Sequence, residues 1–251
     1  MNLRIPRHAC SPRDHARAGD LWRLVQEVAV IHSTECGWPP ERYRELGTGF
    51  VVREITGVHL REARYGEQFE ATTWVGETRR EMLMRRETRL AGVLRATAEW
   101  VHVGSSGGPA RAPKELASAF PVVSDDGPGA RLPEFDPVEE IALPELRVVP
   151  WWTEMDPMGH VNHPRYVDWA EEWVSAWLGG RGVDPVGLVA VAEKVRYRSA
   201  AVAGDDVRVR GALVGFVGDA AVFRARASRG EDTVCDATLV RRHLSGPSAW
   251  A

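Results

Sequence analysis

The stretch Thr153–Trp177 joins a short polar loop to a segment with a continuous apolar face. Aromatic side chains recur in it at spacings of three and four residues, which predicts an amphipathic helix of about four turns. Pro164 suits the first turn, where a backbone N–H has no helical partner, and Asn162 or His163 can cap that end. Gly179-Gly180 is expected to end the helix. The aromatic positions are Tyr166, Trp169, Trp173 and Trp177.

The loop brings a carboxylate, an imidazole and an amide to the positive end of this helix, where a carbonyl group can be polarised. Asp156 is the candidate base or nucleophile, with the alternative that it only forms an Asx-turn with Pro157. His160 can orient an attacking water or carry its proton, and Asn162 can hold water or a carbonyl oxygen. Taken singly, His160 and Asn162 are more often loop-bracing residues.

The run Asp156–Tyr166, Asp-Pro-Met-Gly-His-Val-Asn-His-Pro-Arg-Tyr, resembles the Asp-x-x-Gly-His-Val-Asn-x-x-x-Tyr signature of hotdog-fold thioesterases. It is most similar to the acyl-carrier-protein and 4-hydroxybenzoyl-CoA branches. The resemblance implies an α+β fold in which a long central helix is wrapped by a curved antiparallel β-sheet. It implies the catalytic residues Asp156, His160 and Asn162, with no metal and no cofactor. The substrate-binding residues that we expect are Gly159, Val161, Tyr166, Gln26 and Glu27.

Two departures from the plant-type enzymes restrict the mechanism. Those enzymes place Asn two residues before the signature His, where this chain has Met158. They also carry Glu and Cys after a Tyr-Arg-Arg pattern, where this chain reads Tyr197-Arg-Ser-Ala-Ala201. A mechanism that needs that Glu or Cys is therefore excluded. The simpler arrangement of the 4-hydroxybenzoyl-CoA type, an Asp carboxylate assisted by the helix dipole, remains.

Composition places the chain among globular proteins. Its 251 residues suffice for one large domain or for two of ordinary size, and the net charge of −3 argues against nucleic acid as the main partner. No run of eighteen apolar residues is present, and the first residues lack the apolar core of a signal peptide. Three scattered cysteines fit a reducing compartment better than a disulfide framework or a zinc site. We therefore expect a cytoplasmic protein.

The sequence repeats one pattern twice, a helix followed by strands, with an offset of about 140 residues. A first helix is expected from Asp20 as N-cap to Gly37, and a strand from Leu146 to Trp152 precedes the second. Between the halves, Gly, Pro and Ser gather in a linker with little regular structure. The expected units are 1–110, an N-terminal hotdog; 111–144, the linker; and 145–251, the C-terminal hotdog with the loop. The further strands are expected at 49–60, 69–75, 80–90, 93–103, 188–197, 207–217, 220–228 and 233–242.

The first unit has Asp14-His15 where the loop should be but lacks Gly-His-Val-Asn, so we expect it to be catalytically silent. Because paired hotdogs share a pocket, Gln26 and Glu27 on its helix are candidate contributors, with Glu27 an alternative catalytic carboxylate or simply exposed. The arginines between 79 and 89 are expected to lie on a strand, as a solvated face or as a contact for an acidic carrier protein.

These observations predict an acyl thioesterase of fatty acid and lipid metabolism that acts on an acyl-carrier-protein or CoA thioester. The chain would be a monomer with an internal pseudo-dimer, or a homodimer, with no nucleic acid or membrane partner. Two alternatives remain open: a non-catalytic acyl-thioester-binding hotdog protein, and a hotdog hydratase or dehydratase. The second of these uses an Asp-x-Asn-Pro-x-His pattern, which residues 156–160 do not match.

Overall fold

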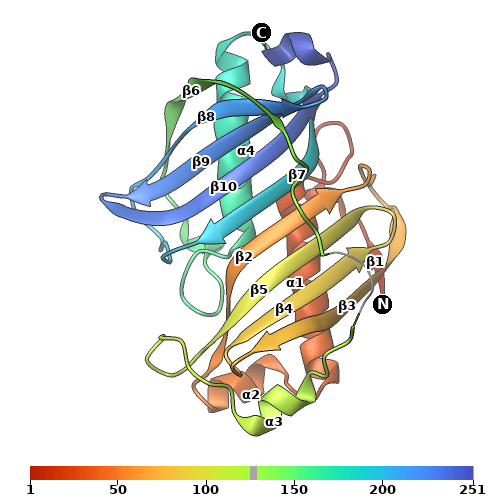
Figure 1. Ribbon diagram of the computed structural model, residues 1–251, viewed down its shortest axis with the longest axis vertical. Helices are drawn as coiled ribbons and strands as arrows, with labels where there is room; N and C mark the ends of the chain where they lie inside the picture. The colour runs from red at the N-terminus through yellow and green to blue at the C-terminus, as the bar shows by residue number, and fades with distance from the viewer. Residues whose placement is uncertain (125–128, 251) are drawn as a thin grey trace.

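Ten antiparallel strands form one continuous sheet, and two long helices lie on one face of it (Figure 1). The structure is a computed structural model that describes residues 1–124 and 129–250. The strand order β1-β3-β4-β5-β2-β7-β10-β9-β8-β6 places five strands from each half of the sequence together. The strands are β1 (Asn2–Arg4), β2 (Gly49–His59), β3 (Gln68–Arg79), β4 (Leu83–Leu90), β5 (Leu94–Val103), β6 (Asp136–Val148), β7 (Leu188–Tyr197), β8 (Val207–Val217), β9 (Ala220–Arg229) and β10 (Asp232–His243).

Both predicted long helices are confirmed, as α1 (Ala18–Glu35) and α4 (Pro164–Gly180). The prediction that Asp20 is the N-cap of the first helix was wrong, because the helix begins two residues earlier, after Arg17. Asp20 instead lies in the first turn, where its carboxylate pairs with Arg17 at 2.7 Å and Arg23 at 3.1 Å. The shorter helices are α2 (Pro40–Glu45) and α3 (Lys114–Ala119), and 3₁₀ turns span Arg7–Ala9, Trp152–Glu154, Pro185–Gly187 and Pro247–Trp250.

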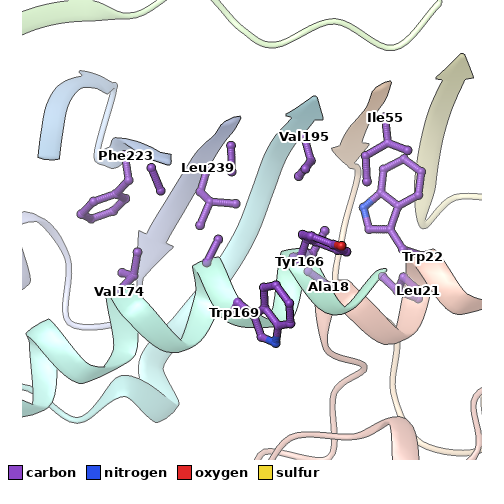
Figure 2. Close-up of a cluster of buried hydrophobic side chains, with 14 of the residues drawn as sticks. Ala18, Leu21, Trp22, Ile55, Tyr166, Trp169, Val174, Val195, Phe223 and Leu239 are labelled. Carbon is purple, nitrogen blue, oxygen red and sulfur yellow. The ribbon is translucent and has the colours of Figure 1, made fainter. Parts of the chain in front are cut away.

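The core fills the space between the helices and the sheet (Figure 2). Ile55 on β2 and Val195 on β7 are fully buried and lie opposite one another in the strand pair that joins the two halves. Burial of side chains of this size stabilises the fold by about 2 kcal/mol each. Trp22 on α1 and Trp173 on α4 are also buried. One hydrophobic cluster therefore contains buried residues of both halves and joins them.

A buried ionic network crosses the same junction. The Glu193 carboxylate on β7 is fully buried and accepts hydrogen bonds of 2.7 Å from Trp22 Nε1 on α1 and from His59 Nε2 on β2. Arg241 on β10 donates to the other carboxylate oxygen at 3.1 Å and to Glu171 on α4 at 2.6 Å. Burial alone would raise the pKa of Glu193, but the charges and hydrogen bonds of these neighbours lower it to about 2.

The structure corrects the bounds of the strand that was expected before the loop. The strand expected at 146–152 is β6, which begins at Asp136, inside the predicted linker, and ends at Val148. Trp151 and Trp152 do not lie in a strand and are 74% and 81% exposed. The linker also contains α3. Residues 125–128 of the linker lie outside the described part of the chain. From Gly129 the chain crosses the face of the sheet opposite the helices, where Ala130 N–H bonds to Thr97 Oγ1 at 2.7 Å (Figure 1).

The run of arginines does not form one surface. Arg79 pairs with Glu77 at 2.6 Å and Arg85 with Glu87 at 3.2 Å, on the β3–β4 hairpin. Arg86 points to the opposite side, because successive strand residues alternate, and is only 5% exposed. Burial lowers its pKa to about 10. The expected solvated face is therefore confirmed for Arg79 and Arg85, which pair with glutamates, and is wrong for Arg86, which is buried.

Candidate active site

The loop before α4 is closed by its own backbone. Met155 and Val161 form an isolated antiparallel bridge. Inside it, Asp156 N–H donates to the His160 carbonyl at 2.8 Å, and Gly159 N–H donates to the Asp156 carbonyl at 3.0 Å. Gly159 has a φ of +81°, a conformation that a side chain would strain. The sequence Pro-Met-Gly thus folds into a tight turn that sets Asp156 and His160 side by side.

Asp156 and His160 are brought together, as the sequence predicts. Asp156 Oδ2 lies 3.5 Å from His160 Nδ1, and the two side chains are 12% and 27% exposed. Asp156 Oδ1 accepts a 2.8 Å hydrogen bond from Met158 N–H, so the expected Asx-turn is also formed. Because this turn uses one oxygen, it fixes the carboxylate while Oδ2 remains beside the imidazole. A separation of 3.5 Å is longer than a hydrogen bond, but such contacts often tighten when substrate binds.

The start of α4 leaves polar atoms free. His163 is the N-cap residue, and no side chain caps the helix, so the expected cap by Asn162 or His163 is not made. Asn162 Oδ1 is buried without a hydrogen-bond partner. Within the described part of the chain, the His163 backbone N–H also has no partner, whereas Arg165 N–H bonds to the Asn162 carbonyl at 2.9 Å. An unused donor and an unused acceptor therefore lie at the positive end of α4.

Tyr166 and Val161 are buried, and both are hydrogen-bonded to Ala201, which fixes the end of the loop. Val161 N–H donates to the Ala201 carbonyl at 2.8 Å, and Ala201 N–H donates to the Tyr166 hydroxyl at 3.0 Å. Both side chains are almost fully buried, and burial raises the pKa of Tyr166 to about 12. The Tyr197 hydroxyl donates to the His163 carbonyl at 2.9 Å. In this structure, Val161 and Tyr166 thus pack in the core beneath the loop.

The first half of the chain contacts the loop at two points. A Cβ built on Gly49, where β2 begins, would lie 3.4 Å from Met158 Cε, and the Trp100 ring on β5 lies 6.0 Å from the His163 ring in an edge-on arrangement. Burial and the nearby positive charges lower the pKa of His163 to about 3, so its ring is neutral. The sequence gives no functional signal for Trp100, because a lone Trp on a strand is most often a core residue.

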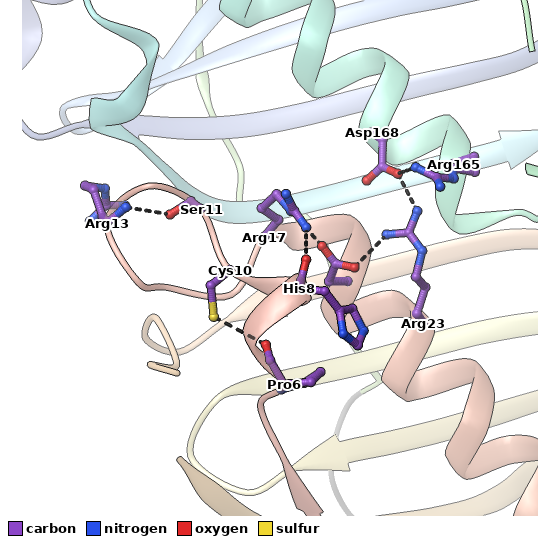
Figure 3. Close-up of polar contacts among 10 residues, drawn as sticks. Pro6, His8, Cys10, Ser11, Arg13, Arg17, Arg23, Arg165 and Asp168 are labelled. Carbon is purple, nitrogen blue, oxygen red and sulfur yellow. Dashed lines mark hydrogen bonds and ion pairs between the residues drawn. The ribbon is translucent and has the colours of Figure 1, made fainter. Parts of the chain in front are cut away.

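Gln26 and Glu27 lie on α1, and among the described residues their side chains make no hydrogen bond or ion pair. Gln26 is half-buried and Glu27 is exposed. The helices α1 and α4 are instead joined by the ion pair of Arg23 and Asp168, which also contacts Arg165 at 3.2 Å (Figure 3). Within residues 1–124 and 129–250, no hydrogen bond or ion pair joins Glu27 to the Asp156 loop.

The loop of the first half, residues 10–17, repeats the backbone of the Asp156 loop with an offset of 145. Cys10 and Ala16 form the bridge; Ser11 N–H donates to the His15 carbonyl at 2.8 Å, and Asp14 N–H donates to the Ser11 carbonyl at 3.0 Å. Asp14, at the position of Gly159, also has a positive φ, of 60°. His15 stands at the position of His160, but Ser11 replaces Asp156.

Arginines fill the surroundings of this first loop. Arg13, at the position of Met158, pairs with Glu62 and donates to the Val186 carbonyl at 2.7 Å and the Leu188 carbonyl at 3.2 Å. Arg17, at the position of Asn162, pairs with Asp20 and donates to the His8 carbonyl (Figure 3). The Arg13 contacts with Val186 and Leu188 fix the first loop against the second half of the chain, whereas the Arg17 contacts stay within the first half.

Two hollows of about 280 Å³ each lie on the surface of the described residues, and neither of these two is lined by the Asp156 loop. One is lined by strand residues that include Trp74 and Arg95, and the other by residues that include Glu54 and Lys194. Over residues 1–124 and 129–250, no group of three or more His, Cys, Asp or Glu side chains could hold a metal ion. No helix in the same residues is both long and apolar enough to cross a membrane.

The segment that contains the Asp156 loop matches a known protein family. Residues 150–245 match the model of the thioesterase-like superfamily, and no curated protein matches the chain. The fold is similar to that of a putative oleoyl thioesterase from Lactobacillus plantarum, at 20% identity and a TM-score of 0.80, over 97% of this chain and 95% of that one.

Two further solved structures are similar over nearly the whole chain. An acyl-ACP thioesterase from Bacteroides thetaiotaomicron has 15% identity and a TM-score of 0.74, with 96% of each chain covered. The 12:0-ACP thioesterase from Umbellularia californica has 18% identity and a TM-score of 0.72, with 97% of this chain and 93% of that one covered. The fold is therefore the hotdog-type thioesterase fold, with a long antiparallel sheet and few helices. The resemblance seen in the loop is confirmed.

Proposed function

We propose that this protein is an acyl thioesterase that hydrolyses an acyl-carrier-protein or acyl-CoA thioester to a free acid and a thiol. The observation that carries the proposal is the loop geometry, which sets the Asp156 carboxylate and His160 beside an unpartnered His163 N–H at the start of α4. The superfamily match covers this loop, and the similar structures include enzymes named for acyl-ACP substrates.

In the proposed reaction, Asp156 takes a proton from a water molecule whose oxygen attacks the thioester carbonyl carbon. The carbonyl oxygen becomes an oxyanion, held by His163 N–H and the positive end of α4. Collapse of this intermediate breaks the carbon–sulfur bond, and the departing thiolate takes the proton from Asp156. His160 and Asn162 position the water. Direct attack by Asp156 on the carbonyl carbon is the variant scheme, in which an acyl-enzyme anhydride forms first.

The chain is proposed to hold two hotdog units, residues 1–110 and 145–251, joined by 111–144, and β6 of the second unit already begins within this joining segment, at Asp136. The matching turns at 10–17 and 155–162 support this division, as does the five-plus-five strand order. The first unit is proposed to be catalytically silent, because Ser11 replaces the carboxylate and Arg13 fills the position of Met158. The two units would then form an internal pseudo-dimer within a monomer or a larger homodimer.

A role in fatty acid or lipid metabolism in the cytoplasm follows from this substrate class and from the three free cysteines. Gly159 is proposed to let substrate approach the turn, since nothing lies within 4 Å of a Cβ built there. Val161, Tyr166, Gln26 and Glu27 are retained as candidate substrate-binding residues. Of these, Glu27 has the weakest support because it is exposed and has no polar partner.

The test is thiol release from a panel of acyl-CoA, aroyl-CoA and acyl-carrier-protein substrates, with wild type and Asp156→Asn compared. The wild type is expected to release thiol, and the variant is expected to lose at least about 10²-fold in kcat. Asp14→Asn, which changes a carboxylate in the first loop, is the control and should keep full activity. Binding of acyl-CoA without thiol release would favour a non-catalytic acyl-binding protein, and hydration of an enoyl-CoA would favour a hydratase.

A further inference from the structure

The strand β5 of the first half carries an unused polar atom close to the proposed site. Trp100 Nε1 is buried and has no hydrogen-bond partner. Most buried side-chain donors in proteins are satisfied, so an orphaned one needs an explanation. Asn162 Oδ1 is a second orphan, on the residue next to His163. A buried donor and a buried acceptor thus both lie without partners around one residue, His163.

The Trp100 ring lies at the boundary between the two halves. Trp100 pairs across the sheet with Val52 on β2 and Met84 on β4, and its ring meets the His163 ring edge-on, with centroids 6.0 Å apart and planes at 79°. Met158 reaches the start of β2. The loop therefore contacts β2 through Met158 and β5 through His163, and the indole lies against the end of α4 where the thioester would bind.

We infer that Trp100 is a catalytic residue supplied by the first unit, whose indole N–H donates a hydrogen bond to the thioester carbonyl oxygen. This inference rests on the proposed function. Together with His163 N–H it gives the oxygen two donors, the usual composition of an oxyanion hole. The indole N–H is a donor only, so it strengthens its bond as negative charge develops on the oxygen and never competes for the proton held by Asp156. Asn162 Oδ1 accepts from the attacking water.

This arrangement explains why a silent first unit is retained. At the matching position of the first loop, Ala18 replaces His163, so no ring contact of this kind can form there. The first unit then contributes to catalysis through β5 and not through its own loop.

The experiment compares Trp100→Phe with Trp74→Phe in steady-state thiol release. Trp74 on β3 also has a buried Nε1 without a partner, but it pairs with Glu87, and the Arg89 guanidinium lies over its ring. Loss of one oxyanion donor is expected to lower kcat by about 10²-fold in Trp100→Phe, with KM changed less than about threefold. Trp74→Phe should stay within about twofold of wild type. An unchanged kcat in Trp100→Phe overturns the inference.

A second readout does not depend on how the variant folds. In the wild-type protein, the ¹⁵N–¹H signal of the Trp100 indole should shift downfield when a ketone analogue, with CH₂ in place of the thioester sulfur, is added. The Trp74 signal should not move. If Asp156→Asn abolishes hydrolysis but the Trp100 signal stays in place, the inference fails and the proposed function stands. If the wild type releases no thiol from any substrate and the Trp100 signal does not move, both fail.

Discussion

Glu193 shows how a single residue can connect the two halves of the chain. Its carboxylate receives hydrogen bonds from Trp22 and His59 of the first half and from Arg241 of the second. Removal of one partner from a buried ion pair leaves the other charge uncompensated and destabilises by about 3 kcal/mol or more. Arg241 is fully buried, so its charge cannot be compensated by solvent.

We expect Glu193→Gln to lower the free energy of unfolding by about 3 kcal/mol at pH 7. The pKa of Glu193 is lowered to about 2 in the folded protein, so its stabilising contribution is full above the unfolded-state pKa near 4.5. That contribution falls as the pH drops towards 2, and the variant and wild type should converge there. Urea unfolding at several pH values between 2.5 and 7 measures this.

Glu54→Gln is the control for this prediction. Glu54 also joins β2 to β7, through Lys194 at 2.7 Å and Arg196 at 2.9 Å, but its partners are about 40% exposed. The loss there should be about 1 kcal/mol or less. If both variants lost the same free energy of unfolding at pH 7, the buried network would stabilise the fold no more than the half-exposed Glu54 ion pairs do.

At the residue scale, the sequence was sufficient to predict which side chains lie together when they belong to one short loop. Asp156 and His160 lie four residues apart, and a tight turn with Gly159 brings them together. Trp100 could not be found in this way, because its nearness to His163 depends on the packing of distant strands. Glu193 was missed for the same reason, since its side-chain partners Trp22, His59 and Arg241 come from three different elements.

The turn before α4 needs a glycine at position 159, whereas the end of α4 does not need one at position 179. Gly159 has a φ of +81°, whereas Gly179, in the last turn of α4, has no positive φ and nothing within 4 Å of a built Cβ. Gly159→Ala should destabilise the protein by about 1 kcal/mol and lower kcat, because the strain displaces Asp156 from His160. Gly179→Ala should be neutral or stabilise by up to about 1 kcal/mol.

Thermal unfolding and thiol release of these two variants check the prediction together. Both substitutions add one methyl group to the same loop-helix unit, so a general effect of added volume would appear in both. A Gly159→Ala variant with wild-type stability and kcat would show that the turn does not control the position of Asp156.

At the element scale, periodicity predicted both long helices and most strands. It failed where local sequence and tertiary pairing disagree. β6 begins at Asp136, although Pro137 and Pro144 read as linker, because the strand is completed by pairing with β8 at the edge of the sheet. Trp151 and Trp152 look like strand residues, yet they follow the last paired residue of β6 and are exposed.

At the scale of the whole molecule, the two halves are joined by the β2–β7 strand pair and by the contact of α1 with α4. The offset of about 140 in the sequence indicated a repeat. The structure supports it, because residues 10–17 and 155–162 make the same backbone hydrogen bonds at an offset of 145. The sequence pattern could not show that Arg13 is fixed to Val186 and Leu188. The Arg13 hydrogen bonds hold the first loop against the second half of the chain, and Met158 makes no such hydrogen bonds at the matching position of the second loop in the described residues.

The central claim is that one of these two loops performs hydrolysis and the other does not. The most direct measurement is kcat for thiol release by Asp156→Asn and Ser11→Ala, which change matching positions, on the best substrate of the panel. The account predicts a loss of at least about 10²-fold for Asp156→Asn and a change of less than about twofold for Ser11→Ala. Full activity in Asp156→Asn, or a comparable loss in Ser11→Ala, would contradict it.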